Sequence, residues 1–419
     1  MKIVLVASSF VVLVFSGLFF FQEKIGADWR VHQIEYRKLL SERALSAGYE
    51  GEVSFPIELR QVYLPDLNRV DRCVTCHLAI EDPRFASELN PLRTHPGDYL
   101  EHHDPARFGC TLCHDGQGRA TTWEDALATD HDKHWPKPVL RAPFLEANCY
   151  RCHGGELAQT PNYNRGKQLF ESGGCLGCHQ RDGRGGYLAP ELRGISDAAP
   201  VLKHPTLERR DELLRRFHGD RNLAYIYESV RFPLAQPADS VMLDYGFSDD
   251  DALALTVYLK SLTHIEPGMP EMPGPAVRSL PLLERGRKTF ELYCRACHGP
   301  QGAGGVKNPN YVNDTIPELN LIAERMFLFE QEDSEILIEA VKKFGNLNDA
   351  DPAPDLPRFP VVLAQYNAIR EVILNGNPAG KADPEGPAPF NMPSWRKSIP
   401  EAEVDAVIAY LVSTYEFEE

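Results

Sequence analysis

All ten cysteines of this 419-residue chain occur in pairs, and each pair is separated by two residues and followed directly by a histidine. Two thiols at this spacing can add to the two vinyl groups of a haem while the adjacent imidazole binds its iron, so the pattern is the attachment signature of c-type haem. The five copies predict five covalently bound c-type haems, attached to Cys73, Cys76, Cys110, Cys113, Cys149, Cys152, Cys175, Cys178, Cys294 and Cys297, with iron bound by His77, His114, His153, His179 and His298.

Cysteines in such pairs have two other uses, zinc binding and thioredoxin-like redox chemistry. Zinc pairs do not require a histidine directly after the second cysteine, and no cysteine is left over for a disulfide. Five identical motifs therefore favour haem, whose iron in such proteins chiefly moves electrons. The formal charge of −16 argues against a nucleic-acid partner, because phosphates require a basic surface. We expect an electron-transfer protein with no catalytic residue of its own.

The N-terminal segment is apolar. Residues 3–21 contain 19 uncharged and mostly apolar positions, which is the length of a membrane-spanning helix. A cleaved signal peptide has an apolar region of about 7–15 residues and a small-residue cleavage site, and no such site precedes Glu23 and Lys24. We therefore expect residues 1–22 to be a single-pass anchor in the bacterial cytoplasmic membrane. Lys2 on the cytoplasmic side would leave the haem domains on the periplasmic side.

The spacing of the motifs separates two kinds of haem region. The first cysteines of successive motifs are 37, 39, 26 and 119 residues apart. Segments of 37 and 39 residues are too short to build a conventional core around each haem, so we expect residues 71–160 to form one trihaem domain with little regular structure. Residues 23–70 are expected to be a juxtamembrane helix and linker, and the helix at 27–45 either acts as a spacer or contacts a partner.

The last two motifs lie in an internal repeat. Gly-x-x-x-Phe precedes each motif, beginning at Gly166 and Gly286, and Pro-Glu-Leu follows each, beginning at Pro190 and Pro317. Both units end in a helical apolar pattern with acidic residues in its first turn. We expect two helical domains, at 161–265 and 284–419, joined by a Pro-rich linker at 266–283. An acidic, Pro-rich insertion lengthens the second domain.

These repeated motifs resemble the class I monohaem cytochrome c fold. The resemblance implies that a proline carbonyl orients each proximal imidazole and that a loop methionine is the distal iron ligand. By position these residues are Pro190 with Met242 and Pro317 with Met392, unless the two methionines are core residues. The expected fold is mainly α with much irregular structure: one transmembrane helix, the trihaem domain and two class I cytochrome c-like domains.

The trihaem region needs a different set of distal ligands. Five histidines beyond the proximal ones lie between Cys76 and Cys149, and a neutral imidazole is a usual second ligand of haem iron. The candidates for three positions, not paired with particular irons, are His95, His103, His131 and His134, and His102 is an alternative to its neighbour. The haem motifs with Thr94-His95-Pro96-Gly97 and His134-Trp135 make residues 23–155 similar to multihaem subunits of bacterial cytochrome b-type quinol-oxidising complexes.

These resemblances imply a membrane-anchored pentahaem cytochrome that carries electrons from a quinol-oxidising membrane complex, with cytochrome b-like subunits, to a periplasmic acceptor. Bis-His haems have lower potentials than His–Met haems, so electrons would leave from the last domain, toward a soluble cytochrome c or a terminal oxidase. The final 119 residues hold 20 acidic and 9 basic side chains, which would attract a basic partner. The alternatives are a haem subunit of a cbb3-like terminal oxidase and, less favoured, a multihaem peroxidase or nitrogen-oxide reductase.

Overall fold

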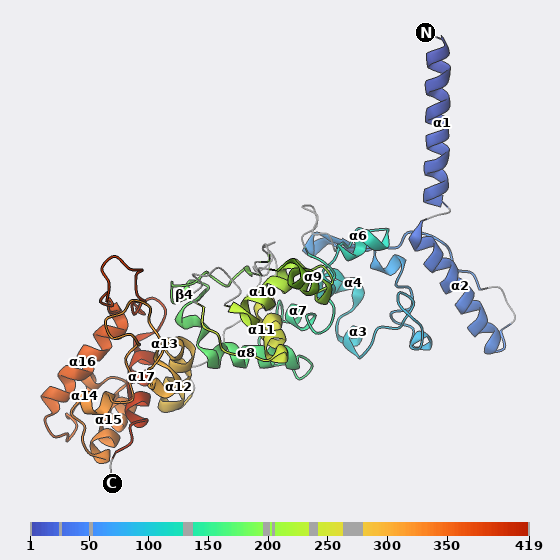
Figure 1. Cartoon of the computed structure of the whole chain (residues 1–419). Coiled ribbons are helices and arrows are strands. Elements are labelled where there is room, and N and C mark those ends of the chain that lie inside the picture. Colours follow the sequence, from blue (N-terminus) through green and yellow to red (C-terminus); the bar gives the residue numbers. More distant parts are fainter. Residues whose placement is uncertain are drawn as a thin grey trace. The chain divides into compact units, whose positions relative to one another are not determined.

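The computed structural model describes residues 2–24, 27–49, 53–128, 137–195, 202, 206–233, 242–262 and 280–417 (Figure 1). The described chain is mainly helical, as the sequence predicts. It divides into two compact units. The first unit takes in Met1–Cys152, Ala199–Glu228 and Ile265–Glu271, and the second takes in His153–Ala198, Ser229–His264 and Met272–Glu419.

The apolar N-terminal segment forms helix α1 (Lys2–Lys24). Across the described parts of the chain, however, no helix has both the length and the apolar character needed to cross a bilayer. The predicted transmembrane anchor is therefore wrong, and so is the localisation that depends on it, a single-pass protein of the cytoplasmic membrane with its haem domains on the periplasmic side.

The first unit is assembled from short elements around one longer helix, α2 (Asp28–Ser46). Strands β1 (Val62–Leu64) and β2 (Arg69–Asp71) pair antiparallel, with Val62 opposite Asp71. The other elements are η1 (Pro65–Leu67), η2 (Cys73–Thr75), η3 (Pro83–Phe85), α3 (Tyr99–His102), α4 (Pro105–Phe108), α5 (Thr111–His114), α6 (Trp123–Leu127), α7 (Glu146–Cys149), α9 (Leu207–Arg216) and most of α10 (Arg221–Arg231).

Helix α2 follows from its sequence. Asp28 lies in its first turn and Arg43 in its last, the placement that the helix dipole favours. Its buried residues Trp29, Gln33 and Tyr36 are four and three positions apart, so they share one face. The Tyr36 ring packs against two phenylalanine rings of the first unit at 5.0 Å between centroids. The helix predicted at 27–45 is thus packed into the first unit along one face.

The second unit contains both copies of the repeat. Strands β3 (Gln180–Arg181) and β4 (Arg184–Gly185) pair antiparallel. Its helices are α8 (Pro161–Gly173), η4 (Cys175–Gly177), α11 (Asp249–Ser261), α12 (Leu282–Tyr293), α13 (Arg295–His298), η8 (Pro300–Gly302), α14 (Ile322–Arg325), α15 (Gln331–Phe344), η9 (Leu347–Asp349), α16 (Phe359–Asn375) and α17 (Glu401–Ser413).

The two copies are built around the same helix crossing. A Cβ atom on Gly166 of α8 would lie 2.0 Å from the carbonyl oxygen of Ala254 in α11, and one on Gly286 of α12 would lie 2.0 Å from that of Ala406 in α17. Only glycine permits so close an approach of two backbones. The crossing therefore explains why the sequence repeats Gly-x-x-x-Phe before each motif.

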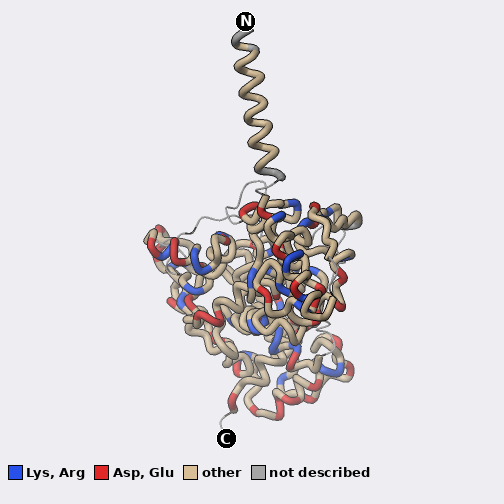
Figure 2. Tube along the Cα trace, turned by 90° about the vertical axis from the view of Figure 1, so that its right-hand side faces the viewer, with Lys and Arg blue, Asp and Glu red and all other residues tan. Residues whose placement is uncertain are grey.

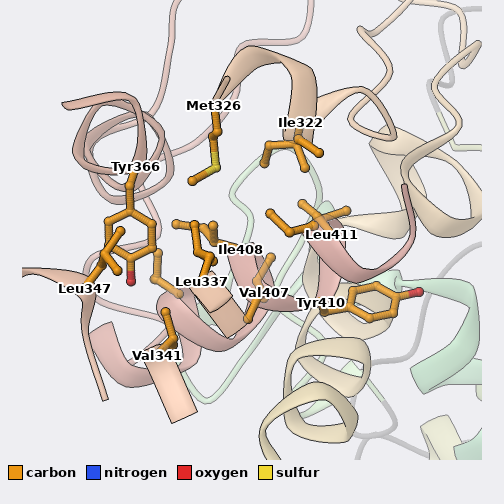
Figure 3. Packing of buried hydrophobic residues seen from close by; sticks show 14 of the residues in the cluster. Ile322, Met326, Leu337, Val341, Leu347, Tyr366, Val407, Ile408, Tyr410 and Leu411 are labelled. Atoms are coloured by element: carbon orange, nitrogen blue, oxygen red, sulfur yellow. The ribbon is translucent and has the colours of Figure 1, made fainter. Parts of the chain in front are cut away.

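The second copy also encloses an apolar cluster. Met326, Leu337, Tyr366 and Ile408 are fully buried in it, and their side chains point toward one another from α14, α15, α16 and α17 (Figure 3). Helices α14 and α15 belong to the segment that the sequence identifies as an acidic insertion. That segment therefore supplies part of the core of the second copy.

Candidate functional site

The fourth and fifth motifs follow directly after the two crossing helices, α8 and α12. The Nδ1 atom of His179 lies 2.8 Å from the carbonyl oxygen of Pro190, and that of His298 lies 3.1 Å from the carbonyl oxygen of Pro317. An Nδ1–H group that donates to a carbonyl fixes the tautomer and leaves Nε2 free to bind a metal. Both contacts that the resemblance implies are present.

A third proximal histidine has the same kind of partner. His77 is hydrogen-bonded to the carbonyl of Pro91, and this bond raises its pKa, although burial and neighbouring histidines lower the pKa overall. Burial likewise lowers the pKa of His114, His179 and His298. Neutral imidazole is the form that binds iron. The sequence analysis missed Pro91, although a Pro-Leu pair follows His77 as Pro-Glu-Leu follows the later motifs.

Thiols of two pairs of successive motifs lie side by side. In the first unit the Cys73 and Cys110 thiols are hydrogen-bonded, which lowers the pKa of Cys73 and raises that of Cys110. In the second unit the Cys178 and Cys297 thiols are hydrogen-bonded in the same way. The Cys113 thiol also lies close enough to the third motif for the two cysteines there to raise its pKa.

The ten motif cysteines are all free thiols. Burial raises the pKa of Cys113 to about 11 and that of Cys175 and Cys294 to about 12. Within the described residues no three His, Cys, Asp or Glu side chains gather as metal ligands. Ten unpaired thiols, each pair followed by an imidazole, are the donor set that covalent haem attachment requires.

Asp71 ties the first two motifs together. This fully buried carboxylate accepts hydrogen bonds from the backbone N–H of Cys110 at 2.6 Å, from that of Thr111 at 3.0 Å and from the Thr111 hydroxyl at 2.7 Å. A Cβ atom on Gly109 or Gly118 would lie within 2.3 Å of its oxygens. Asp71 therefore fixes where the second motif begins relative to the first, a role that no spacing in the sequence indicates.

The third motif is bonded to the second. Arg151 forms a buried ion pair with Asp115 at 2.9 Å and donates to the carbonyl of Leu112 at 3.1 Å. The Asn148 side chain donates to the carbonyl of Cys113 at 2.7 Å. The first three motifs thus form one continuous bonded cluster.

The predicted distal histidines have different environments. The rings of His95 and His114 lie 6.1 Å apart between centroids. An imidazole nitrogen binds a metal at about 2 Å, and the ring centroid lies about 1 Å further away, so two rings on opposite sides of one iron are about 6 Å apart. His103 is hydrogen-bonded to the Tyr99 carbonyl at 3.0 Å, and His102 lies 4.0 Å from Asp98. His131 and His134 lie outside the described residues.

The two predicted methionine ligands stand where the sequence puts them, shortly before the last helix of each copy. Met242 is half-buried. Met392 is half-buried against the apolar cluster, and its backbone pairs with Asn377 through two 3.0 Å hydrogen bonds. Met326, by contrast, is completely buried in that cluster and is a core residue.

Comparison with known proteins separates the two copies. Residues 163–263 match the cytochrome c family, and residues 281–411 match the family described as cytochrome c oxidase, cbb3-type, subunit III. A cytochrome c oxidase subunit 2 from Alkalihalophilus pseudofirmus is 30% identical over 104 residues. That match covers 25% of this chain and only 26% of the relative. No solved structure matches the chain. The chain thus carries two cytochrome c domains and is a c-type cytochrome with covalently bound haem and an electron-transfer role.

Proposed function

We propose that this chain is a pentahaem electron-transfer subunit that takes electrons from a quinol-oxidising membrane complex with a cytochrome b-like subunit and passes them to a soluble cytochrome c or a terminal oxidase. The observation that carries the proposal is the contact between thiols of the first and second motifs and of the fourth and fifth motifs. Haems bonded to these sulfurs would lie close together, so that electrons could pass from one to the next.

In the first unit this arrangement makes a path through three haems. The Cys73–Cys110 contact joins the first haem to the second, and the proximity of Cys113 to Cys149 and Cys152 joins the second to the third. We pair His95 with His114 as the two axial ligands of the second iron, because their ring separation suits an iron between them. Bis-His ligation gives the low potential expected of an entry point.

In the second unit the Cys178–Cys297 contact joins the last two haems. We propose Met242 and Met392 as their distal ligands, which would give these haems the higher potentials. Electrons would leave from the last domain, whose helix α15 carries the exposed acidic residues Glu332, Glu335 and Glu339. Acidic residues, drawn in red, also recur toward the C-terminus in Figure 2. Such charges favour a basic acceptor through long-range attraction.

The runner-up is a haem subunit of a cbb3-like terminal oxidase. It is favoured by the match of residues 281–411 to the cbb3-type subunit III family. The three motifs of the first unit have no role in that assignment, so we rank it second.

Two measurements test the proposal. A redox titration followed by electron paramagnetic resonance (EPR) should show five low-spin haems, whereas a persistent high-spin haem that reacts with peroxide or nitrite would indicate an enzyme instead. Affinity isolation of the tagged full chain from detergent-solubilised native cells should recover a cytochrome b-like protein. Recovery of a copper–haem oxidase subunit would favour the runner-up.

A further inference from the structure

Helix α2 is fixed against the first haem motif by one buried side chain. Gln33, fully buried, donates from Nε2 to the carbonyl oxygen of Thr75 at 2.9 Å and to that of Glu58 at 2.7 Å, and its Oε1 accepts from the backbone N–H of Glu58 at 2.9 Å. Thr75 lies between the two cysteines of that motif. Because both N–H groups of the Gln33 amide donate and its Oε1 accepts, the register of α2 on the motif is well determined.

The first turn of α2 lies beside the same motif. The carboxylate of Asp28 is close enough to Cys76 to contribute to the raised pKa of that thiol, and it accepts a hydrogen bond from the backbone of Trp123 at 3.2 Å. The Asp28 and Gln33 contacts therefore place the segment between them, which includes His32, alongside the cysteines and proximal histidine of the first motif.

His32 directly precedes Gln33 and is half-buried. It lies three positions after the buried Trp29 and four before the buried Tyr36, so it is on the face of α2 that packs into the first unit, where Gln33 meets the first motif. His95 lies beside His114 of the second motif instead, with 6.1 Å between the ring centroids.

We propose that His32 of helix α2 is the distal ligand of the first haem iron, opposite His77. The proposal rests on the proposed haem attachment at Cys73 and Cys76, and it deepens the proposed function by giving the first haem bis-His ligation from two separate parts of the chain. The sequence leaves two roles open for α2, a spacer and a contact with a partner. The proposal adds a third role, in which α2 completes a haem site.

The test uses the full haem-loaded chain and the variant His32→Ala. One fifth of the haem iron should change from low-spin to high-spin in the EPR spectrum, while the haem content measured by the pyridine haemochrome assay stays at five per chain. Added imidazole should restore the low-spin signal. The matched control is His218→Asn, since His218 is an exposed histidine of the same unit that is not a ligand candidate, and its spectrum should equal that of the wild type.

A second variant covers the case in which His32→Ala loses the first haem. His32→Met keeps an axial ligand, so it should retain five low-spin haems, raise the potential of one of them and add the near-infrared charge-transfer band of His–Met ligation. An all-low-spin His32→Ala protein with five haems, or a His32→Met protein with unchanged potentials, would overturn the assignment. Fewer than five haems in the wild-type chain would instead refute the proposed function, so the two failures are distinguishable.

Discussion

The first cytochrome c domain crosses α8 over α11 at Gly166, and the second crosses α12 over α17 at Gly286, with the same backbone separation. An ion pair accompanies each crossing, and here the two domains differ. Arg165 and Asp251 of the first domain are 50% and 28% exposed, whereas Arg285 and Glu403 of the second are 20% and 10% exposed. The haem site constrains the crossing, while the surrounding helices set how deeply it is buried.

The polar contacts of the final helices differ as well. In the first domain, Tyr258 of α11 accepts a hydrogen bond from Arg181 at 2.6 Å. In the second, Asp405 of α17 is buried and receives hydrogen bonds from Tyr366 at 2.5 Å and Arg370 at 2.6 Å, both on α16. Asp405 therefore binds α16 to α17 through a buried ion pair.

The largest effect on stability is expected at the buried pair of Arg370 and Asp405. Arg370→Ala should lower the free energy of unfolding of the second domain by about 3–5 kcal/mol, because it leaves the Asp405 carboxylate buried without its cation. Urea unfolding followed by circular dichroism measures the loss. Arg396→Ala, which removes a much more exposed arginine of the same domain, is the control and should cost about 1 kcal/mol or less. Equal losses in the two variants would contradict the assigned role of Asp405.

The proposed methionine ligands give the next effect. Met242→His and Met392→His should each lower the potential of one haem by on the order of 0.1 V, within the roughly 0.8 V range that axial ligands set. A potentiometric titration of all five haems measures the change. Met326→Leu is the control because Met326 is a core residue. A variant whose titration matches the wild type would remove that methionine from the ligand set.

An alanine in place of the glycine should destabilise both helix crossings by the same amount. Gly166→Ala and Gly286→Ala should each cost about 2 kcal/mol, since overpacking exceeds the roughly 1 kcal/mol that alanine gains in a helix. Thermal unfolding detected through the haem absorbance of each domain measures both. Gly155→Ala is the control, because nothing lies within 4 Å of the added atom. A neutral effect at one crossing only would show that the two are not equivalent.

The ion pairs beside the two crossings should differ in how much stability is lost when the arginine is removed. Arg165→Ala should change the free energy of unfolding by less than about 1 kcal/mol because the pair is exposed. Arg285→Ala should cost about 1–2 kcal/mol more, since it leaves Glu403 buried. The Arg285–Glu403 contact at 3.1 Å is electrostatic, without hydrogen-bond alignment. Denaturant midpoints of the two variants give the comparison, and a larger loss for Arg165→Ala would reverse it.

The smallest effect is a difference in pH dependence. Hydrogen bonds from Arg193 lower the pKa of Asp182 in the first domain below its ordinary 3.8, so this group stabilises the fold above that pH and its contribution is lost on acidification through the lowered pKa. Burial raises the pKa of Asp405 in the second domain, so its contribution is full below pH 3.8 and is lost as the pH rises through the raised pKa. Asp182→Asn and Asp405→Asn should change the pH slope of stability in opposite directions. Identical slopes would contradict this contrast.

Much of the second unit is predictable because its signals are local or repeated. The proline contacts of His179 and His298 follow from positions relative to their motifs. The contact of His298 forms despite the long insertion after its motif. The predicted membrane anchor rested on the length and apolar character of residues 3–21, and no helix in the described part of the chain meets both criteria. The domain boundaries and the methionine ligands remain predictions.

The sequence alone determines where haem is attached, because two thiols and an imidazole within five residues meet the same porphyrin whatever the rest of the chain does. It does not determine which histidine reaches which iron from the other side. His95 lies 19 residues before His114, and His32 lies 45 residues before His77. A distal ligand comes from a separate segment with no fixed spacing. Only tertiary contacts decide this, such as the Gln33 hydrogen bonds that place α2 on the first motif, where we propose His32 as the ligand.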